Sequence, residues 1–480
     1  MIGGNCSLRD PAGRLLVVDG RVLRIVAKPA VDSLLTLLRS PTTKQFTDHG
    51  ALIETRVAED IDIASLGCQM GDNFPFGHSE PGIIVEHPRI DFPSFPHEWP
   101  VEMLHAAARL TLELAEAFLI EGIGLKDADP RNILFRGPRP VFVDILSFEK
   151  RDPGDPVWLP YAQFVRTFLL PLLVNKHFGI PLSQLSLAGH DGLRPQDVYP
   201  LLGLARKFLP PFITLVSLPV WLSKTVDKGN MAIYKKKRQR DPERSRFILR
   251  SLFDRLNKLT ERAMPTGGES VWSSYMSSKG YSSEEFSAKK SFIETALAET
   301  RPKKILDVGC NTGYFSLVAA RQGARVVAID SDPVVVGETW RQALKEDLDI
   351  LSLVVNLASP TPALGWRNRE SASFLERSFG SFDAVMMLAV VHHLLVTEQI
   401  PLHEIAGLAA ELTKDILLIE FVEPNDPLFQ SLTLGRDYLY QGLTAAAFET
   451  LFRRHFDIIR DLRLCKGTRS LYVMRKKPCQ

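Results

Sequence analysis

The chain has 480 residues, of which 45% are hydrophobic and 24% charged, and its formal net charge is +2. That length predicts two or three domains with full cores, and the near-neutral charge excludes a protein held on nucleic acid or lipid by overall charge alone. Five scattered cysteines without C-x-x-C spacing favour a reducing cytoplasm and predict neither a disulfide frame nor a metal site.

The N-terminal part combines a hairpin, a long helix and a polar cluster. The pattern GRLLVVDGRVLRIV predicts a β-hairpin over residues 13–26, and helical spacing predicts an amphipathic helix over 102–120. The segments GLKDADPRNILF and PVFVDILSFE follow, and they contain Asp127, Asn132 and Asp144. We therefore expect an N-terminal α+β domain.

The order Asp127, Asn132, Asp144 resembles the catalytic and metal loops of protein-kinase-like and small-molecule phosphotransferases. In that family the first Asp orients a hydroxyl, and the Asn and the second Asp hold Mg²⁺. The resemblance implies a kinase-like domain with a remnant of a phosphotransfer site.

The chain also departs from the phosphotransferase pattern. Leu125 stands where the family has a His, no D-F-G follows, and no glycine-rich loop precedes the cluster. Arg24 or Lys28 is the candidate phosphate-pairing residue, with Glu54 as its partner. The alternative interpretation is a buried network of salt bridges and turns in a binding domain.

The stretch over 208–222, FLPPFITLVSLPVWL, is the most membrane-like part of the chain. It is too short to span a bilayer and contains three prolines, so we expect a broken helix or loop packed on the N-terminal domain. The alternative is an interfacial anchor helped by the basic run KKKRQR at 235–240. A basic linker over 223–264 would then join a domain of residues 1–222 to one of residues 265–480.

Strand and helix patterns alternate through the C-terminal domain. We expect helices over 287–300, 314–322, 333–345, 400–413 and 445–455, and strands over 304–308, 326–330, 350–355, 382–388, 416–421 and 469–475. This alternation predicts an α/β fold with a Rossmann-like, doubly wound parallel sheet. Its ligand should lie at the carboxyl ends of the first strands.

Residues 304–330, KILDVGCNTGYFSLVAARQGARVVAID, carry the clearest functional signal. Gly309 and Gly313 lack a Cβ, so the backbone there can adopt a positive φ and approach a ligand. Asp330 closes the second strand and can accept both hydroxyls of a ribose. A strand, a glycine turn, a helix and a strand that ends in an acid predict half of a nucleotide-binding sheet.

Two ligands compete for that geometry. A dinucleotide needs a third glycine and places its pyrophosphate at the helix end, whereas Asp307 would repel a pyrophosphate and attract an ammonium group. The turn D-x-G-x-x-x-G thus resembles motif I of class I S-adenosylmethionine-dependent methyltransferases. The resemblance implies a cofactor site at Asp307, Gly309, Gly313 and Asp330, with Asn356 where many relatives have an acid that contacts the adenine.

The fourth predicted strand ends in AVVHHL, which resembles the end of that strand in many small-molecule methyltransferases. His392 and His393 are therefore the candidate catalytic residues, as lining of the methyl-transfer pocket or as a base near neutral pH. In the alternative interpretation, one of them caps the following helix and the other is exposed.

Other polar and aromatic residues are expected near the same site. Glu420 and Glu423 flank the end of the fifth strand, where either can hold an acceptor or pair with an arginine. Trp272, Tyr275 and Tyr281 stand where related enzymes cover the cofactor with an aromatic lid, although packing in the core explains them equally well.

Three segments, KDADPRNILFRGPRPVFVDILSFE, NLASPTPALGW and LAVVHHL with IEFVEPNDP, resemble a bacterial family of two-part proteins that includes rhizobial host-specific nodulation proteins. This resemblance implies modification of a symbiotic signal or surface glycan.

We therefore expect a cytoplasmic S-adenosylmethionine-dependent methyltransferase with a small-molecule or glycan-type acceptor. The alternatives are an ATP-dependent phosphotransferase with an S-adenosylmethionine-sensing domain, and a non-catalytic scaffold that binds S-adenosylmethionine. The short basic run and the missing N-P-P-Y-type motif argue against nucleic acid, and membrane contact rests on 208–222 alone.

Overall fold

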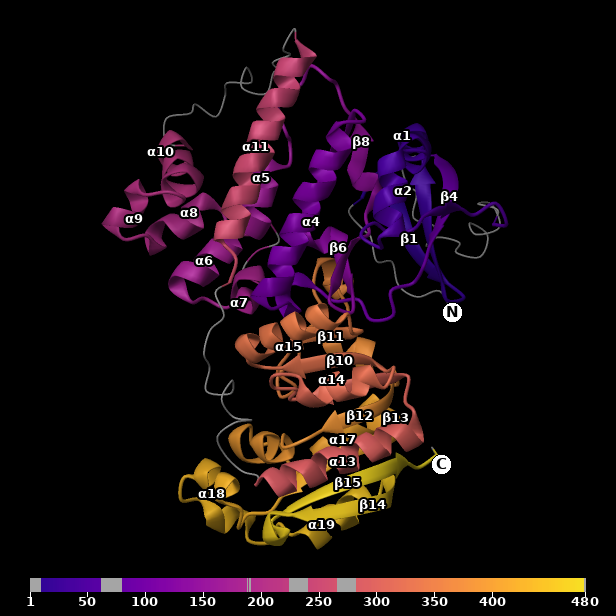
Figure 1. Cartoon of the computed structure of the whole chain (residues 1–480), viewed down its shortest axis with the longest axis vertical. Coiled ribbons are helices and arrows are strands. Elements are labelled where there is room, and N and C mark those ends of the chain that lie inside the picture. Colours follow the sequence, from indigo (N-terminus) through magenta and orange to yellow (C-terminus); the bar gives the residue numbers. More distant parts are fainter. Residues whose placement is uncertain are drawn as a thin grey trace. The chain divides into compact units, whose positions relative to one another are not determined.

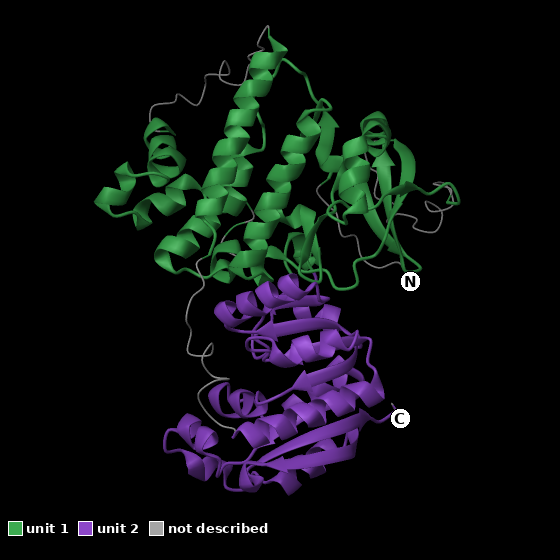
Figure 2. Ribbon diagram, in the orientation of Figure 1, with its two compact units in different colours: residues 1–266, 363–371 green, residues 267–362, 372–480 purple. Residues whose placement is uncertain are grey.

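The computed structural model describes residues 10–61, 80–187, 189, 191–223, 241–265 and 282–478. The chain divides into two compact units, shown in different colours in Figure 2. Unit 1 comprises residues 1–266 and 363–371, and unit 2 comprises residues 267–362 and 372–480. Unit 1 therefore includes a short segment from between two strands of unit 2.

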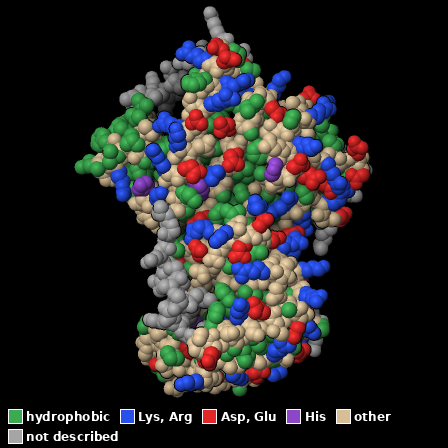
Figure 3. All heavy atoms as spheres, viewed as in Figure 1, with side chains coloured by type: hydrophobic (Ala, Val, Ile, Leu, Met, Phe, Trp, Pro, Cys, Tyr) green, Lys and Arg blue, Asp and Glu red, His purple; other side chains and the backbone are tan. Residues whose placement is uncertain are grey.

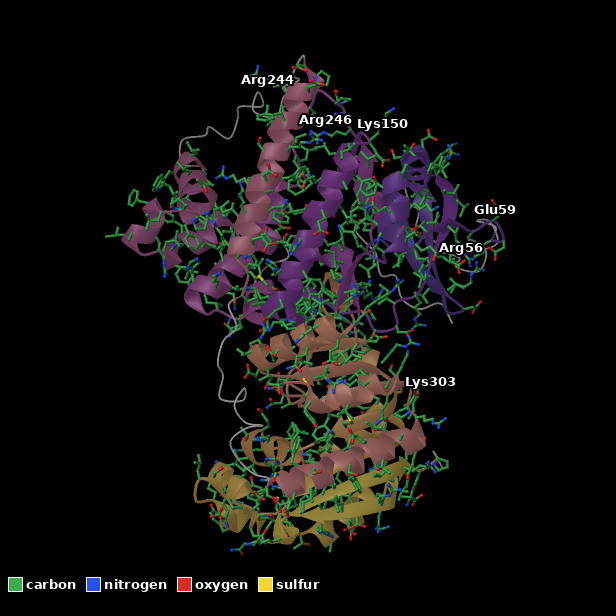
Figure 4. The ribbon with its side chains drawn as sticks, in the orientation of Figure 1. Arg56, Glu59, Lys150, Arg244, Arg246 and Lys303 are labelled. Carbon is green, nitrogen blue, oxygen red and sulfur yellow. The ribbon has the colours of Figure 1, made fainter. Side chains whose placement is uncertain are left out.

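Unit 1 begins with a four-stranded antiparallel sheet in the order β1, β2, β4, β3, of which Figure 1 labels β1 and β4. Its strands are β1 (Gly13–Val18), β2 (Arg21–Ala27), β3 (Arg56–Val57) and β4 (Pro81–His87). β1 and β2 form the predicted hairpin, and Asp19 and Gly20 at its turn have φ of 49° and 81°. Such turns match the twist of paired strands. At the other edge of the sheet Arg56, labelled in Figure 4, pairs with Glu86.

Helices α1 (Val31–Leu38) and α2 (Pro41–Asp48) follow the hairpin, and the long helix α4 (Val101–Leu119) follows the sheet. α4 lies within one residue of the prediction at each end, and most of its side chains are buried. Two short antiparallel pairs come next: β5 (Ile123–Leu125) with β8 (Phe148–Lys150), and β6 (Ile133–Arg136) with β7 (Arg139–Phe142). Backbone hydrogen bonds from Lys126 to Ser147 and from Val143 to Asn132 draw the loops of both pairs together.

Between 161 and 262, the described residues of unit 1 form helices joined by short loops. These helices are α5 (Tyr161–Phe164), η6 (Val165–Leu169), α6 (Leu170–Phe178), α7 (Leu182–Leu187), α8 (Pro195–Val198), η7 (Tyr199–Leu201), α9 (Leu204–Phe208), η8 (Ile213–Ser217), α10 (Leu218–Ser223) and α11 (Pro242–Arg262). α11 corrects the predicted linker over 223–264. Its apolar residues Leu249, Phe253 and Leu256 recur at helical spacing and are buried, and the Phe253 ring lies 5.1 Å from that of Trp158. Residues 242–262 are therefore part of unit 1, while the basic run 235–240 lies outside the described residues.

Unit 2 is built on a seven-stranded sheet in the order β11, β10, β9, β12, β13, β15, β14. The strands are β9 (Lys304–Val308), β10 (Arg325–Asp330), β11 (Ile350–Val354), β12 (Phe382–Met387), β13 (Thr413–Val422), β14 (Phe456–Leu464) and β15 (Arg469–Lys476). The first five are parallel, as predicted, but β15 is antiparallel to both of its neighbours. The Rossmann-like α/β class is thus confirmed with a mixed sheet.

The helices of unit 2 are α13 (Ser283–Thr300), α14 (Tyr314–Arg321), α15 (Pro333–Glu346), α16 (Phe374–Ser378), α17 (Leu402–Leu412), α18 (Pro427–Thr433) and α19 (Ala445–Phe452). Successive side chains of a strand point to opposite faces of the sheet. Ile305 belongs to a core cluster with α13 and α14, yet its neighbour Leu306 is also 0% exposed. Both faces of the sheet are therefore covered, as a doubly wound fold requires.

The prediction lacks β14, α16 and α18. In β14 the sequence FDIIRDLRL interleaves charged and apolar residues, and exposure alternates along the strand. This pattern fits the edge of a sheet with one face in solvent, but it has no continuous apolar run. The strand with which it pairs, β15, also comes later in the chain.

The order of the sheet reverses between β9 and β12, its first and fourth strands. Loops on the two sides of such a point diverge, and ligands of open α/β sheets bind there, at the carboxyl ends of the strands. The glycine turn follows the carboxyl end of β9, whereas Lys303, labelled in Figure 4, precedes its amino end. The predicted site residues therefore gather along one edge of the sheet.

Candidate active site

The turn between β9 and α14 has a left-handed backbone at both predicted glycines. Gly309 has a φ of +68° and Gly313 a φ of +80°. A Cβ at Gly313 would lie 2.5 Å from Cγ2 of Thr339 on α15, and one at Gly309 would lie 3.1 Å from Cγ2 of Val390. Both conformation and space therefore favour glycine at these two positions, most strongly at Gly313.

Asp330, at the end of β10, is bonded to this turn. Its Oδ2 accepts the backbone N–H of Asn311 at 3.0 Å, and its Oδ1 accepts that of Asp332 at 3.0 Å. Burial raises the pKa of Asp330 above its usual value, and these backbone bonds oppose the rise. A carboxylate oxygen can accept more than one hydrogen bond, so the group can hold the turn and still bind hydroxyls.

Asp307 is buried within β9, with 3% of its surface exposed. Its Oδ2 accepts a hydrogen bond from Oγ of Ser316 on α14 at 2.5 Å. Burial raises the pKa of Asp307 to about 7, despite that hydrogen bond. Within the described parts of the chain, no lysine or arginine forms an ion pair with this carboxyl group.

Asn356 lies beyond the end of β11 and is exposed. The preceding residue, Val355, donates its N–H to the backbone oxygen of Asp330 at 2.9 Å, which places Asn356 beside the end of β10. Oδ1 of Asn356 accepts the N–H of Ala358 at 2.9 Å. The amide oxygen thus supports a local turn beside the carboxyl end of β10.

His392 is buried at the amino end of η11 (His393–Thr397), with 2% of its surface exposed. Among the described residues, neither of its ring nitrogens has a hydrogen-bond partner, and its ring centroid lies 4.2 Å from that of His393. Burial, followed by the nearby His393 and Arg469, lowers the pKa of His392 well below its usual value. The ring is therefore neutral at pH 7, and it neither caps η11 nor faces solvent.

The backbone before the two histidines is strained. Ala389 has a φ of +56°, which non-glycine residues adopt rarely because the Cβ then approaches the backbone. Strain of this kind is found where a fold fixes a functional segment. His393 is half-buried, and burial lowers its pKa.

A buried ion pair lies at the next strand. Nζ of Lys289 on α13 donates to Oε2 of Glu420 on β13 at 2.6 Å, and the two side chains are 5% and 0% exposed. The same Nζ lies 5.4 Å from the ring centroid of Phe315. Glu420 thus pairs with a lysine, whereas Glu423 is half-buried and bonds through its N–H to Thr468 at 2.8 Å.

A second buried pair joins the start of β15 to the start of α18. Nε of Arg469 donates to Oδ2 of Asp426 at 2.8 Å and its Nη2 donates to Oδ1 at 3.1 Å, a two-pronged contact. Burial favours the neutral acid, but the bonds from Arg469 prevail and hold the pKa of Asp426 below its usual value. Pairing of Glu420 was predicted as one alternative, but with an arginine. Lys289 and the Arg469–Asp426 pair were not predicted, because nothing near Lys289 or Arg469 in the sequence marks them as buried.

In unit 1, Asp127, Asn132 and Asp144 form one hydrogen-bonded cluster. Nδ2 of Asn132 donates to Oδ2 of Asp127 at 3.3 Å and to Oγ of Ser147 at 3.2 Å. Oγ of Ser147 donates in turn to Oδ2 of Asp144 at 2.5 Å. Burial, then the nearby Asp129, raises the pKa of Asp127. The sequence pattern therefore corresponds to a cluster in space.

The cation of this cluster comes from β2. Nη1 of Arg24 forms an ion pair with Oδ1 of Asp144, and the arginine is only 6% exposed. Lys28 instead pairs with Glu80 at 2.8 Å on the surface. The expected partnership with Glu54 was therefore wrong: Glu54 is exposed, and the carboxylate beside Arg24 is Asp144.

Three further observations concern the predicted lid, metal ligands and membrane-spanning helices. The predicted lid residues Trp272, Tyr275 and Tyr281 lie outside the described residues. Within the described ranges, no three His, Cys, Asp or Glu side chains are grouped as a metal site would need. No helix in those ranges combines the length and apolar character needed to cross a bilayer.

The comparisons with known proteins point to methyl transfer. Residues 281–463 match the family model described as a methyltransferase domain. The chain is 26% identical over 487 aligned positions to nodulation protein NoeA of Rhizobium meliloti (strain 1021), which covers 98% of this chain and 95% of that protein.

Solved structures resemble parts of the chain. The match to N-methyltransferase NodS of Bradyrhizobium japonicum WM9 covers 41% of this chain and 98% of NodS, at 12% identity and a TM-score of 0.29. The match to the bifunctional kinase-methyltransferase WbdD covers 44% of this chain and 42% of the WbdD chain, at 18% identity and a TM-score of 0.29. Scores this low carry no weight on substrate or mechanism. The C-terminal domain thus matches a methyltransferase family model, and its sheet has the Rossmann-like strand order of a class I methyltransferase fold.

Proposed function

We propose that this chain methylates a small molecule or a glycan with S-adenosylmethionine as donor. One observation carries the proposal: the Asp330 carboxylate is bonded to the backbone of the glycine turn, at the edge of the sheet where such ligands bind. When bound there, the cofactor supplies an electrophilic methyl group on a sulfonium. The chain must then hold the donor, align the acceptor and exclude water.

The cofactor side of the proposal assigns one role to each predicted residue. Asp330 accepts the ribose hydroxyls, and the turn at Gly309 and Gly313 lets the backbone approach the ligand. Asp307 is the electrostatic partner of the ammonium group, which would supply the cation that this buried carboxyl lacks among the described residues. Asn356, at the same edge, borders the adenine.

The acceptor side centres on His392. Its unpartnered ring nitrogens, one donor and one acceptor in the neutral ring, suit a hydroxyl or amine of the acceptor. Lys289, Asp426 and Arg469 are close enough to influence its pKa. Polar surroundings of this kind favour a hydroxyl-rich acceptor over an apolar one, and we assign His393 to the same side of the site.

Calorimetry with the folded full-length protein tests the cofactor assignment. We expect S-adenosylmethionine to bind at submillimolar concentration, and the proposal fails if it does not. Transfer of a labelled methyl group into fractions of a cell extract then tests the acceptor class. Label in a metabolite or glycan fraction supports it, and label only in protein or nucleic acid contradicts it. Binding without transfer to any fraction would favour a scaffold.

A matched pair of histidine variants tests the acceptor side. His392→Asn should lower turnover by about tenfold or more while it leaves S-adenosylmethionine affinity unchanged. His403→Asn, at an imidazole on α17 whose side chain is 63% exposed, should change neither. Equal turnover in the two variants would remove His392 from the site.

The biological setting is also a proposal. The similarity to NoeA extends over 98% of this chain, which supports a role in host-specific nodulation through a modified signal or surface glycan. Cys310 and Cys465 are free thiols, in keeping with the cytoplasmic location that we propose from cysteine usage.

Phosphotransfer by unit 1 is the second candidate. The observation in its favour is the cluster of Asp127, Asn132 and Asp144, the residue types that orient a hydroxyl and hold Mg²⁺ in phosphotransferases. If unit 1 is active, Mg-ATP should raise the melting temperature, and Asp144→Ala should abolish that rise. No shift in the unmodified protein would reject this function.

A further inference from the structure

The predicted broken helix at 208–222 is present as α9, η8 and α10, and it has an unusually apolar outer surface. Six large apolar side chains between 201 and 222 are exposed: Leu201 (43%), Leu204 (81%), Phe208 (61%), Leu209 (55%), Leu218 (41%) and Leu222 (59%). Single exposed apolar residues are ordinary, but a contiguous group usually marks a binding surface. We call these six residues the α9–α10 surface.

These side chains belong to a packed structure. Leu204 and Phe208 are four residues apart on α9 and so share one face of the helix. The Phe208 ring lies 5.7 Å from that of Trp221 on α10, whose Nε1 donates to the hydroxyl of Tyr199 at 3.1 Å. On the opposite side, Phe212, Leu215 and Val216 are buried and anchor the helices in unit 1. In Figure 3 the green side chains gather at the left edge of unit 1, where Figure 1 places α9 and α10.

The charged residues within this surface segment are all basic. Residues 199–223 contain no Asp or Glu, and α9 carries Arg206 and Lys207 between its exposed apolar residues. Arg206 lies 5.0 Å from the Phe178 ring and Lys207 lies 4.3 Å from the Tyr199 ring, which holds both cations at this part of unit 1. In sequence, residues 224–240, which follow, include seven Lys or Arg and one Asp.

We propose that the α9–α10 surface binds the interface of an anionic membrane. Apolar side chains of this kind enter the boundary between headgroups and acyl chains, while neighbouring cations attract anionic headgroups. A second copy of the chain is a poorer occupant, because two copies of a surface without acidic residues would bring like charges together. A surface anchor also needs no spanning helix, and the described residues contain none.

Vesicle binding by the full-length protein tests this proposal. We expect cosedimentation with vesicles of phosphatidylcholine and phosphatidylglycerol, weaker binding to phosphatidylcholine alone, and release by high salt because screening removes the attraction. Absence of binding to the anionic vesicles would overturn the proposal. Binding of equal strength to both compositions would overturn its electrostatic part.

Two double variants make the test specific. Leu204→Asn with Phe208→Asn should weaken binding to anionic vesicles by about tenfold or more, since each side chain loses its burial in lipid. Leu434→Asn with Leu439→Asn changes residues of unit 2 that are equally exposed, at 80% and 59%, and should leave binding unchanged. Equal losses in both would contradict a local surface.

Melting temperature and sedimentation without lipid complete the test. Both double variants should have the melting temperature of the unmodified protein, because the substituted side chains are exposed. If the α9 variant is destabilised, Leu204→Asn alone should still weaken binding. A change of oligomeric state in the α9 variant without lipid would show that the surface joins two copies of the chain, and would overturn the membrane proposal.

Discussion

The two units treat a buried acidic group in different ways. In unit 1, Asp144 has an internal counter-ion, Arg24, within the predicted polar cluster. In unit 2, Asp307 is buried beneath the glycine turn with a hydroxyl as its hydrogen-bond partner, and its pKa rises to about 7. A carboxyl group that forms no ion pair with the described residues is ready for a positively charged ligand. A carboxylate that already has an internal counter-ion, such as Asp144, belongs to a structural network unless a ligand displaces that counter-ion.

The contrast extends within unit 2. The carboxylates of Glu420 and Asp426 are compensated by Lys289 and Arg469, whereas among the described residues the two oxygens of Asp330 have only backbone N–H donors. Compensated carboxylates should therefore govern stability, and uncompensated ones should govern ligand binding. Four substitutions can break or sharpen this division.

The largest expected effect is the loss of stability on substitution of Lys289. Lys289→Met leaves Glu420 buried without its cation and should lower the free energy of unfolding by about 3–5 kcal/mol, measured by denaturant titration. The double variant Lys289→Met with Glu420→Met should recover most of that loss. Lys290→Met is the control, because Lys290 is 42% exposed and its pair with Glu294 is 3.8 Å long, and it should cost less than about 1 kcal/mol.

Asp330→Ala should weaken S-adenosylmethionine binding by about 1.5–3 kcal/mol in calorimetry, the scale of charge-assisted hydrogen bonds. Asp349→Ala, at an exposed acid before the amino end of β11, should leave the affinity unchanged. Unaltered affinity in the Asp330 variant would remove this acid from the ribose site.

Arg24→Met should lower the free energy of unfolding of unit 1 by about 1–3 kcal/mol at pH 7 without weakening S-adenosylmethionine binding. The pKa of Asp144 is held below its usual value of 3.8 because the nearby Arg24 and the Ser147 bond outweigh burial. Its contribution to stability is thus present above pH 3.8 and is lost as the pH falls through the lower, folded value. The difference between variant and parent should shrink in acid; a constant difference would contradict the pair.

The smallest expected effect is the pH dependence of S-adenosylmethionine affinity that Asp307 should cause. The carboxylate form should bind the ammonium group, so affinity for S-adenosylmethionine should fall below about pH 7, by up to about tenfold per pH unit. Asp307→Asn should bind weakly and without this dependence. Because the folded pKa is raised above 3.8, the ligand-free domain loses stability as the pH rises toward 7, and the variant should lose less. Flat affinity between pH 6 and pH 8 in the parent would refute the assignment.

Much of unit 2 was predictable because its signals are local. The strand and helix periods from 304 to 354 predict elements that agree with the structure within a few residues. Gly309 and Gly313 indicate a positive backbone φ, which other residues adopt rarely. α11 was missed because its segment is rich in Lys and Arg, although Leu249, Phe253 and Leu256 give the helix a buried face. Composition alone does not distinguish a solvated linker from an amphipathic helix.

The sequence by itself determined the α/β alternation, the glycine turn and the acids that follow the strands, since each depends on residues within one or two turns of the chain. Only the tertiary structure decided which charges are paired: Lys289 and Glu420 are 131 residues apart, Arg24 and Asp144 are 120 apart, and Arg469 and Asp426 are 43 apart. Burial of such pairs depends on how distant segments pack. The same holds for β15, whose antiparallel place between β13 and β14 is set by its partners and not by its own pattern.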